Sequence, residues 1–231
     1  MVELIKNTLR PVKHLIRPPC LLVHSFSQEG EDRILSRVFE EKSNGFYVDV
    51  GAHHPVHLSN TYYFYCRGWR GINIDAAPGS MSAFHQLRPN DINLEVGIGE
   101  EPGTLPFHIF NEATLSTFDP AVARERDGVK HYRMTEVRPV KIRTLAQVLG
   151  ESLPAGLSID FLSVDVEGFD LSVLRSNDWN RFRPAYVLAE DYTYGNVEEV
   201  LKSPIALFLK SVGYVLFART AHTEIYQRLR A

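Results

Sequence analysis

The sequence predicts an α/β domain built on a mostly parallel β-sheet with helices on both faces. From residue 27 onward, helical and strand-like segments alternate along the chain, which is typical of such a sheet. Several of the short apolar strands end in an acidic residue. The length of 231 residues permits one large domain or two small ones, and one core is the simpler interpretation. We therefore expect an N-terminal extension over residues 1–24 and a single domain over residues 25–231.

The first half of the chain alternates regularly. Apolar residues one turn apart predict a helix that begins near Ser27, and Pro78 is typical of the start of a later helix. The expected order is a helix from about residue 27, a strand over 45–50, a helix over 60–67, a strand over 71–75, a helix over 78–87 and a strand over 91–96.

The pattern changes in the middle of the chain. Residues 104–110 alternate like a strand, residues 137–142 resemble its antiparallel partner, and a polar stretch lies between them. Long segments inside a compact domain are usually functional or mobile. We expect an inserted β-hairpin over about residues 104–142 that acts as a substrate cap; a disordered surface excursion is the alternative.

The second half returns to alternation and ends in extended segments. The expected order is a strand over 159–164, a helix over 170–176, a strand over 186–189, a helix over 197–211 and two extended segments over 213–217 and 223–227.

Composition excludes several classes of protein. With 25 Lys and Arg against 28 Asp and Glu, the chain lacks a basic footprint, so we expect no nucleic-acid partner. Two cysteines, Cys20 and Cys66, are too few for a disulfide framework and favour a reducing cytoplasm. No apolar run approaches the roughly 20 residues that span a bilayer.

The first 17 residues mix basic and apolar side chains without the continuous apolar run of a signal peptide. They predict a solvated arm or a packing helix. Peripheral membrane contact is the alternative, and the apolar residues could also mediate a homodimer.

Four predicted strands end in acids, namely Asp49, Asp75, Asp165 and the pair Glu190 and Asp191. Ligands of an open parallel sheet bind outside the carboxyl ends of its strands, so these side chains should converge on one crevice. Gly51 lies where the backbone must approach a ligand closely, and Asp75 follows it by 24 residues, at a position suited to two ribose hydroxyls. The pair predicts an adenosine-like ligand.

The glycine pattern distinguishes between adenosine cofactors. A dinucleotide site needs Gly-x-Gly-x-x-Gly to place a helix N-terminus on a pyrophosphate, but Gly51 is followed by His53, His54 and Pro55. S-adenosylmethionine, which has a ribose and no phosphate, fits this loop better than NAD(P) does. An NAD(P)-dependent oxidoreductase is the alternative. A second alternative is that the protein binds the cofactor as a subunit without catalytic activity. Asp49 would face the amino-acid end of the cofactor, and helix capping is its alternative role.

Four ordered motifs resemble the FkbM family of S-adenosylmethionine-dependent methyltransferases. They are Ser-Gln-Glu-Gly-Glu-Asp at 27–32, Phe-Tyr-Val-Asp-Val-Gly-Ala-His at 46–53, Gly-Trp-Arg-Gly-Ile-Asn-Ile-Asp at 68–75 and Asp-Val-Glu-Gly at 165–168. The resemblance spans about residues 25–192. It implies a class I methyltransferase fold, Rossmann-like, whose seven-stranded sheet has an antiparallel last strand. It also implies methyl transfer to a hydroxyl of a sugar, glycolipid, glycan or polyketide-type small molecule.

The resemblance also assigns the cofactor site by position. The loop after the first strand should hold the cofactor, the second strand should supply the ribose acceptor, and the region after the third strand should touch adenine. The segment at 27–32 should close over the cofactor, although Ser27 could instead simply cap a helix. The expected cofactor-binding residues are Gln28, Asp49, Gly51, Ala52, His53, Asp75, Ala76, Val96, Gly97 and Asp165.

Methyl transfer to an alcohol needs a general base or a metal that lowers the pKa of the hydroxyl. Asp165 is the first choice because it ends a central strand; helix capping is its alternative role. Asp165, Glu190 and Asp191 together also suit Mg²⁺, which binds few carboxylates and keeps water or substrate oxygens. His54 is the alternative base, although a loop histidine is often only a surface hydrogen-bonding group.

Overall fold

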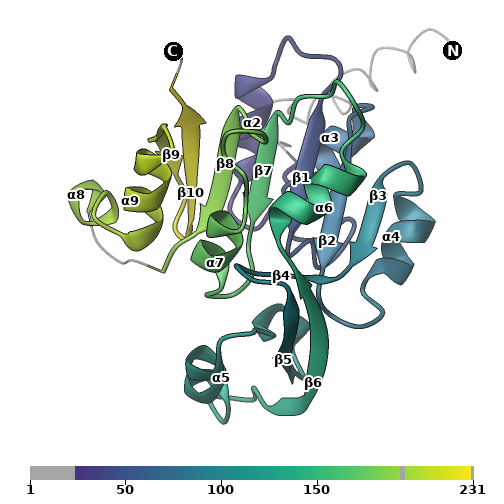
Figure 1. Ribbon diagram of the computed structural model, residues 1–231, viewed down its shortest axis with the longest axis vertical. Helices are drawn as coiled ribbons and strands as arrows, with labels where there is room; N and C mark the ends of the chain where they lie inside the picture. Colours follow the sequence, from purple (N-terminus) through teal and green to yellow (C-terminus); the bar gives the residue numbers. More distant parts are fainter. Residues whose placement is uncertain (1–23, 193–195, 230–231) are drawn as a thin grey trace, which may run out of the picture.

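The computed structural model describes residues 24–192 and 196–229. Its main layer is a seven-stranded sheet with the order β3-β2-β1-β7-β8-β10-β9 (Figure 1). The strands are β1 (Phe46–Val50), β2 (Arg70–Asp75), β3 (Ile92–Glu95), β7 (Phe161–Val164), β8 (Tyr186–Glu190), β9 (Tyr214–Arg219) and β10 (Thr223–Arg228). Five neighbouring strands pair in parallel, and β10 pairs antiparallel with both β8 and β9. The predicted mostly parallel sheet with an antiparallel last strand is confirmed.

Both faces of this sheet are buried. Phe46, Val48 and Val50 of β1 belong to one apolar core, and Tyr47 belongs to another on the opposite face, because successive strand side chains alternate. The helices that accompany the sheet are α2 (Glu31–Val38), α3 (Tyr62–Cys66), α4 (Met81–Leu87), α6 (Leu145–Ser152), α7 (Asp170–Arg175), α8 (Val197–Val200) and α9 (Pro204–Ser211). No helix among the described residues is both long and apolar enough to cross a membrane.

Several helices differ from the sequence expectation for local reasons. Helix α2 begins at Glu31 rather than near Ser27, because Gly30 is left-handed (φ 92°) and the Asp32 carboxylate accepts hydrogen bonds from the preceding turn. The expected helix over 197–211 is divided in two, since Ser203 caps a new helix at Pro204. Helix α6 was not expected; Thr144 and Gln147 form its capping box.

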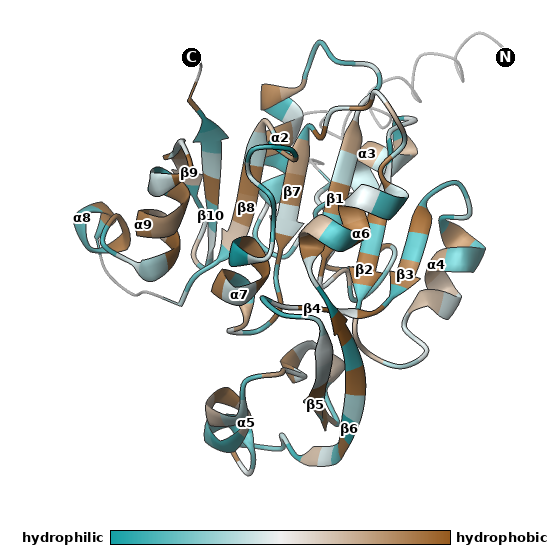
Figure 2. Cartoon of the chain, in the orientation of Figure 1, coloured by the Kyte–Doolittle hydropathy of each residue, from teal (hydrophilic) through white to brown (hydrophobic). Residues whose placement is uncertain are grey.

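A smaller sheet forms the middle of the chain. It has the order β4-β6-β5, with β4 (Gly97–Ile98), β5 (Gly103–Phe110) and β6 (Met134–Arg143). Strands β5 and β6 pair antiparallel, and their connection carries a 3₁₀ turn over 113–115 and helix α5 (Pro120–Arg126). This insertion lies beneath the carboxyl ends of the parallel strands (Figure 1). Strand β6 alternates between hydrophobic and hydrophilic residues along its length (Figure 2).

Most of the expected N-terminal extension, residues 1–24, lies outside the described residues. The same holds for Cys20 and for any membrane or dimer contact made by that segment.

Candidate active site

A pocket of about 400 Å³ opens at the carboxyl ends of β1, β2 and β7. Strand β1 pairs with β2 on one side and with β7 on the other, so the pocket lies at the topological switch point of the sheet. The insertion contributes to the wall, since Phe107, Thr114 and Phe118 are among the lining residues. The volume is within the usual range for a small-molecule site.

Gly51 is required by the crossing of two chain segments. Its φ is 84°, and a Cβ at this position would lie 1.7 Å from the carbonyl oxygen of Asp165. Its N–H donates a hydrogen bond to Ile74 O at 2.9 Å. Only a glycine allows the end of β1 to pass so close to the end of β7.

Asp75 holds the loop after β1 and lines the pocket. Its carboxylate accepts hydrogen bonds from the backbone N–H of His53 (2.8 Å) and of Ala77 (2.7 Å). Each oxygen has a second lone pair, so further hydroxyl donors can still be accepted. Burial raises the pKa of Asp75, and the two backbone N–H groups oppose that rise.

Seven of the ten predicted cofactor residues line the pocket: Gln28, Gly51, His53, Asp75, Ala76, Val96 and Asp165. The other three, Asp49, Ala52 and Gly97, are not among its lining residues. Ala52 packs with Met81 and Phe84, and Gly97 leaves room for the side chains of Ile142 and Phe118. Asp49 is buried on β1 and accepts a hydrogen bond from Thr61 Oγ1 at 2.8 Å.

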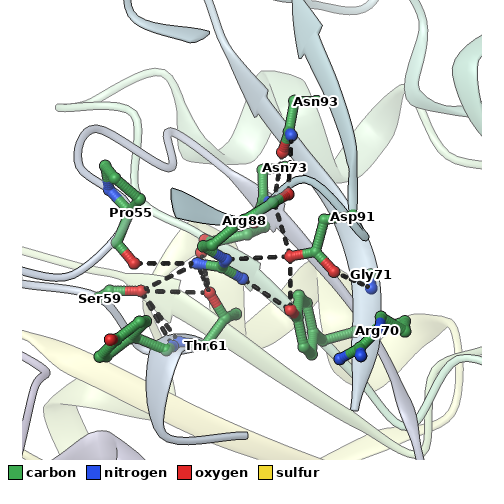
Figure 3. A network of polar contacts seen from close by, with 12 residues as sticks. Pro55, Ser59, Thr61, Arg70, Gly71, Asn73, Arg88, Asp91 and Asn93 are labelled. Carbon is green, nitrogen blue, oxygen red and sulfur yellow. Dashed lines mark hydrogen bonds and ion pairs between the residues drawn. The ribbon is translucent and has the colours of Figure 1, made fainter. Parts of the chain in front are cut away.

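A buried polar network around Arg88 connects the loop after β1 to the sheet (Figure 3). The guanidinium of Arg88 is fully buried and donates to Asp91 (2.9 Å), to the Tyr47 hydroxyl (2.7 Å) and to Thr61 Oγ1 (3.0 Å). Thr61 in turn donates to Asp49. Burial raises the pKa of Asp49 to about 6, and the nearby Arg88 charge and the Thr61 hydroxyl oppose a larger rise.

Three carboxylates gather at the other end of the pocket. Oxygens of Asp165, Glu167 and Glu190 lie within 4.8 Å of one another. Burial, followed by the charge of Glu167, raises the pKa of Glu190 to about 8. Burial and the charge of Glu190 raise the pKa of Asp165 well above its usual value. Buried like charges of this kind are frequent in catalytic sites.

Asp191 is not part of this group, although the sequence analysis placed it there with Asp165 and Glu190. Its charge is one of the causes that raise the pKa of Glu224, and its backbone N–H donates to His222 O. Neighbouring residues on an extended strand point to opposite faces, so Glu190 and Asp191 diverge. Glu167, which was not predicted as a site residue, takes its place; the available signal was its position in the Asp-Val-Glu-Gly motif at 165–168.

His54 is not among the residues that line the pocket, and its ring instead makes hydrogen bonds within its own loop. Its Nδ1 accepts hydrogen bonds from the backbone N–H of Val56 and of His57, each at 3.0 Å. Burial and the neighbouring histidines lower the pKa of His54, which favours the neutral ring that can accept these bonds. Its role as a base stays a prediction.

Fold and pocket together define a Rossmann-like protein of the class I methyltransferase type, with a small-molecule pocket at the switch point of a seven-stranded sheet. Residues 49–216 match the Methyltransferase FkbM domain. The chain therefore belongs to the FkbM methyltransferase family.

One solved structure adds a distant likeness. It is a TehB-like SAM-dependent methyltransferase from Corynebacterium glutamicum, 10% identical, covering 97% of each chain with a TM-score of 0.40. No curated protein matches the chain.

Proposed function

We propose that this methyltransferase uses S-adenosylmethionine to methylate a hydroxyl group of a sugar, glycan, glycolipid or polyketide-type small molecule. The observation that carries the cofactor assignment is the charge of the pocket. Its described lining residues include three acids, Asp75, Asp165 and Glu167, and neither lysine nor arginine. S-adenosylmethionine carries no phosphate, so it suits this lining better than a dinucleotide, whose pyrophosphate would meet no cationic side chain among the described lining residues.

The described residues suit the parts of this cofactor. Asp75 can accept the ribose hydroxyls, because each of its oxygens keeps a lone pair. Ala76, Val96 and Ile98 offer an apolar wall for adenine. When bound, the cofactor supplies a methyl group activated by the sulfonium, and the protein supplies orientation and a proton acceptor.

We assign the proton acceptor to Asp165. It lies in the pocket wall at the end of the central strand β7, and its raised pKa makes its carboxylate a stronger base than an ordinary aspartate. The replacement Asp165→Asn should lower kcat for methyl transfer by about 10²- to 10⁴-fold, well beyond any loss of cofactor affinity from its place in the pocket wall. A rate within a few-fold of wild type would remove Asp165 from the mechanism.

A divalent cation such as Mg²⁺ is a second proposal for the same end of the pocket. The group of Asp165, Glu167 and Glu190 supports it, but Arg126 already pairs with Glu167 at 2.6 Å and supplies a positive charge there. A cation would have to share Glu167 with this guanidinium. Transfer activity that survives thorough EDTA treatment contradicts the metal proposal.

The acceptor is to be identified by an activity screen. Nucleotide sugars, lipopolysaccharide fragments and macrolides would be incubated with the protein and methyl-labelled cofactor, and labelled products separated. Label in a hydroxyl-bearing acceptor supports the proposal. Tight cofactor binding without transfer to any acceptor would favour a non-catalytic cofactor-binding subunit, and binding of NAD⁺ in place of S-adenosylmethionine would favour an oxidoreductase.

A further inference from the structure

The turn that follows β7 has an unusual backbone. Glu167 has a φ of 57° and Gly168 a φ of 93°, so two consecutive residues lie in the left-handed region. That region is disfavoured for a residue with a Cβ and persists only where its surroundings hold it. Asp165 begins this turn, so the contacts that fix the turn also fix the acid at the reacting end of the pocket.

The insertion contacts this turn at three points. Thr117 Oγ1 donates a hydrogen bond to the carbonyl oxygen of Glu167 at 2.9 Å. Helix α5 lies against Gly168, where a Cβ would be 3.1 Å from Val122 Cγ2. The guanidinium of Arg126, at the end of α5, pairs with Glu167 Oε2 at 2.6 Å. The insertion therefore binds both the backbone and the side chain of Glu167.

Arg126 is itself fixed in place. Its Nη1 donates to Leu115 O at 3.1 Å, within the insertion, and its guanidinium lies over the Tyr192 ring at 6.0 Å. The Tyr192 hydroxyl donates to the same Glu167 oxygen at 2.9 Å. The side chains of Arg126 and Glu167 are only 18% and 17% exposed, so their charge-assisted contact is stronger than that of a surface pair.

We infer that Arg126 is a positioning residue: it holds Glu167 in its left-handed conformation and thereby sets the place of Asp165 at the reacting end of the pocket. In this account the insertion is part of the catalytic apparatus. The inference rests on the proposed function for the role of Asp165, but the contact between Arg126 and the turn can be tested without any acceptor.

The first test measures amide hydrogen exchange of the full chain, without cofactor, in a peptide that covers residues 166–169. Arg126→Met should speed exchange there by about tenfold, because it removes the charged contact among those that hold the turn. Arg126→Lys, which keeps the charge, should recover most of the protection. Arg124→Met is the matched control, since Arg124 is an exposed residue of the same helix, and it should exchange like wild type.

The second test separates turnover from cofactor binding, with the acceptor found in the screen. Arg126→Met should lower kcat at least about tenfold and leave KM for S-adenosylmethionine within about twofold, with partial rescue by Arg126→Lys.

Wild-type exchange or wild-type kcat in Arg126→Met would overturn the inference, as would equal effects of Arg124→Met. A wild-type protein that does not bind S-adenosylmethionine would instead overturn the proposed function, and the exchange data would still judge the contact between Arg126 and the turn.

Discussion

The two ends of the pocket are held in different ways. At the cofactor end, Asp75 has two backbone donors, and the loop over 51–61 is braced by the buried Arg88 network inside the sheet domain. At the reacting end, three carboxylates face one another, and the turn that carries two of them is held by the insertion. The proposed cofactor end is therefore braced from within the sheet domain, while the proposed reacting end depends on contacts from the insertion.

The largest expected effect concerns the brace at the cofactor end. Arg88→Met leaves Asp91 buried without its guanidinium and should lower the free energy of unfolding by about 3 to 5 kcal/mol. Urea unfolding would measure this loss. Arg67→Met, at an exposed arginine, is the control and should change stability by less than about 1 kcal/mol. Equal losses in both variants would show that the network does not brace the loop.

Glu224, a buried acid on β10, should make the protein less stable as pH rises. Burial raises the pKa of Glu224 to about 7 from an ordinary 4.5, and the charge of Asp191 adds to the rise. A group whose folded pKa is raised stabilises the fold fully below its unfolded pKa and loses that contribution as pH rises through about 7.

Glu224→Gln should remove this loss, so that the variant gains about 2 to 3 kcal/mol relative to wild type between pH 4.5 and 8.5. Thermal unfolding across this pH range would follow the difference. Glu198→Gln, at an exposed site, should track wild type at every pH. A constant difference between Glu224→Gln and wild type would mean that Glu224 does not titrate in this range.

Replacing His54 should have the smallest effect, because its ring supports the loop after β1 and does not line the pocket. Because its Nδ1 holds a turn of the cofactor loop, His54→Ala should cost about 1 kcal/mol of stability and lower the transfer rate by less than about tenfold. His57→Ala, at the exposed neighbour, is the comparison. A fall in rate beyond about 100-fold, with cofactor affinity unchanged, would restore His54 as a base.

The order of strands and the acids at their ends follow from the sequence, because apolar runs, glycines and acids are local signals. The Arg88 network does not, since Tyr47 and Thr61 are far in the chain from the Arg88–Asp91 pair and only the fold brings them together. The presence of Glu167 in place of Asp191 in the carboxylate group depends on the left-handed turn after β7, so strand alternation alone does not predict it. The pairing of Arg126 with Glu167 does not follow from the sequence either, because the path of the insertion is set by tertiary packing.

The helix boundaries also include one that local sequence signals predict and one that depends on side-chain contacts. The break before α9 was signalled by Ser203 and Pro204, whereas the late start of α2 depends on how the Asp32 side chain contacts the turn before it.

The proposed cofactor site can be tested by calorimetric titration of S-adenosylmethionine into wild type and Asp75→Ala, with Glu101→Ala as an exposed control. If the pocket is the cofactor site and Asp75 binds the ribose, wild type and Glu101→Ala will bind alike, and Asp75→Ala will bind about 10- to 100-fold more weakly. Wild-type affinity in Asp75→Ala would contradict the ribose assignment, and absence of binding to wild type would contradict the cofactor site itself.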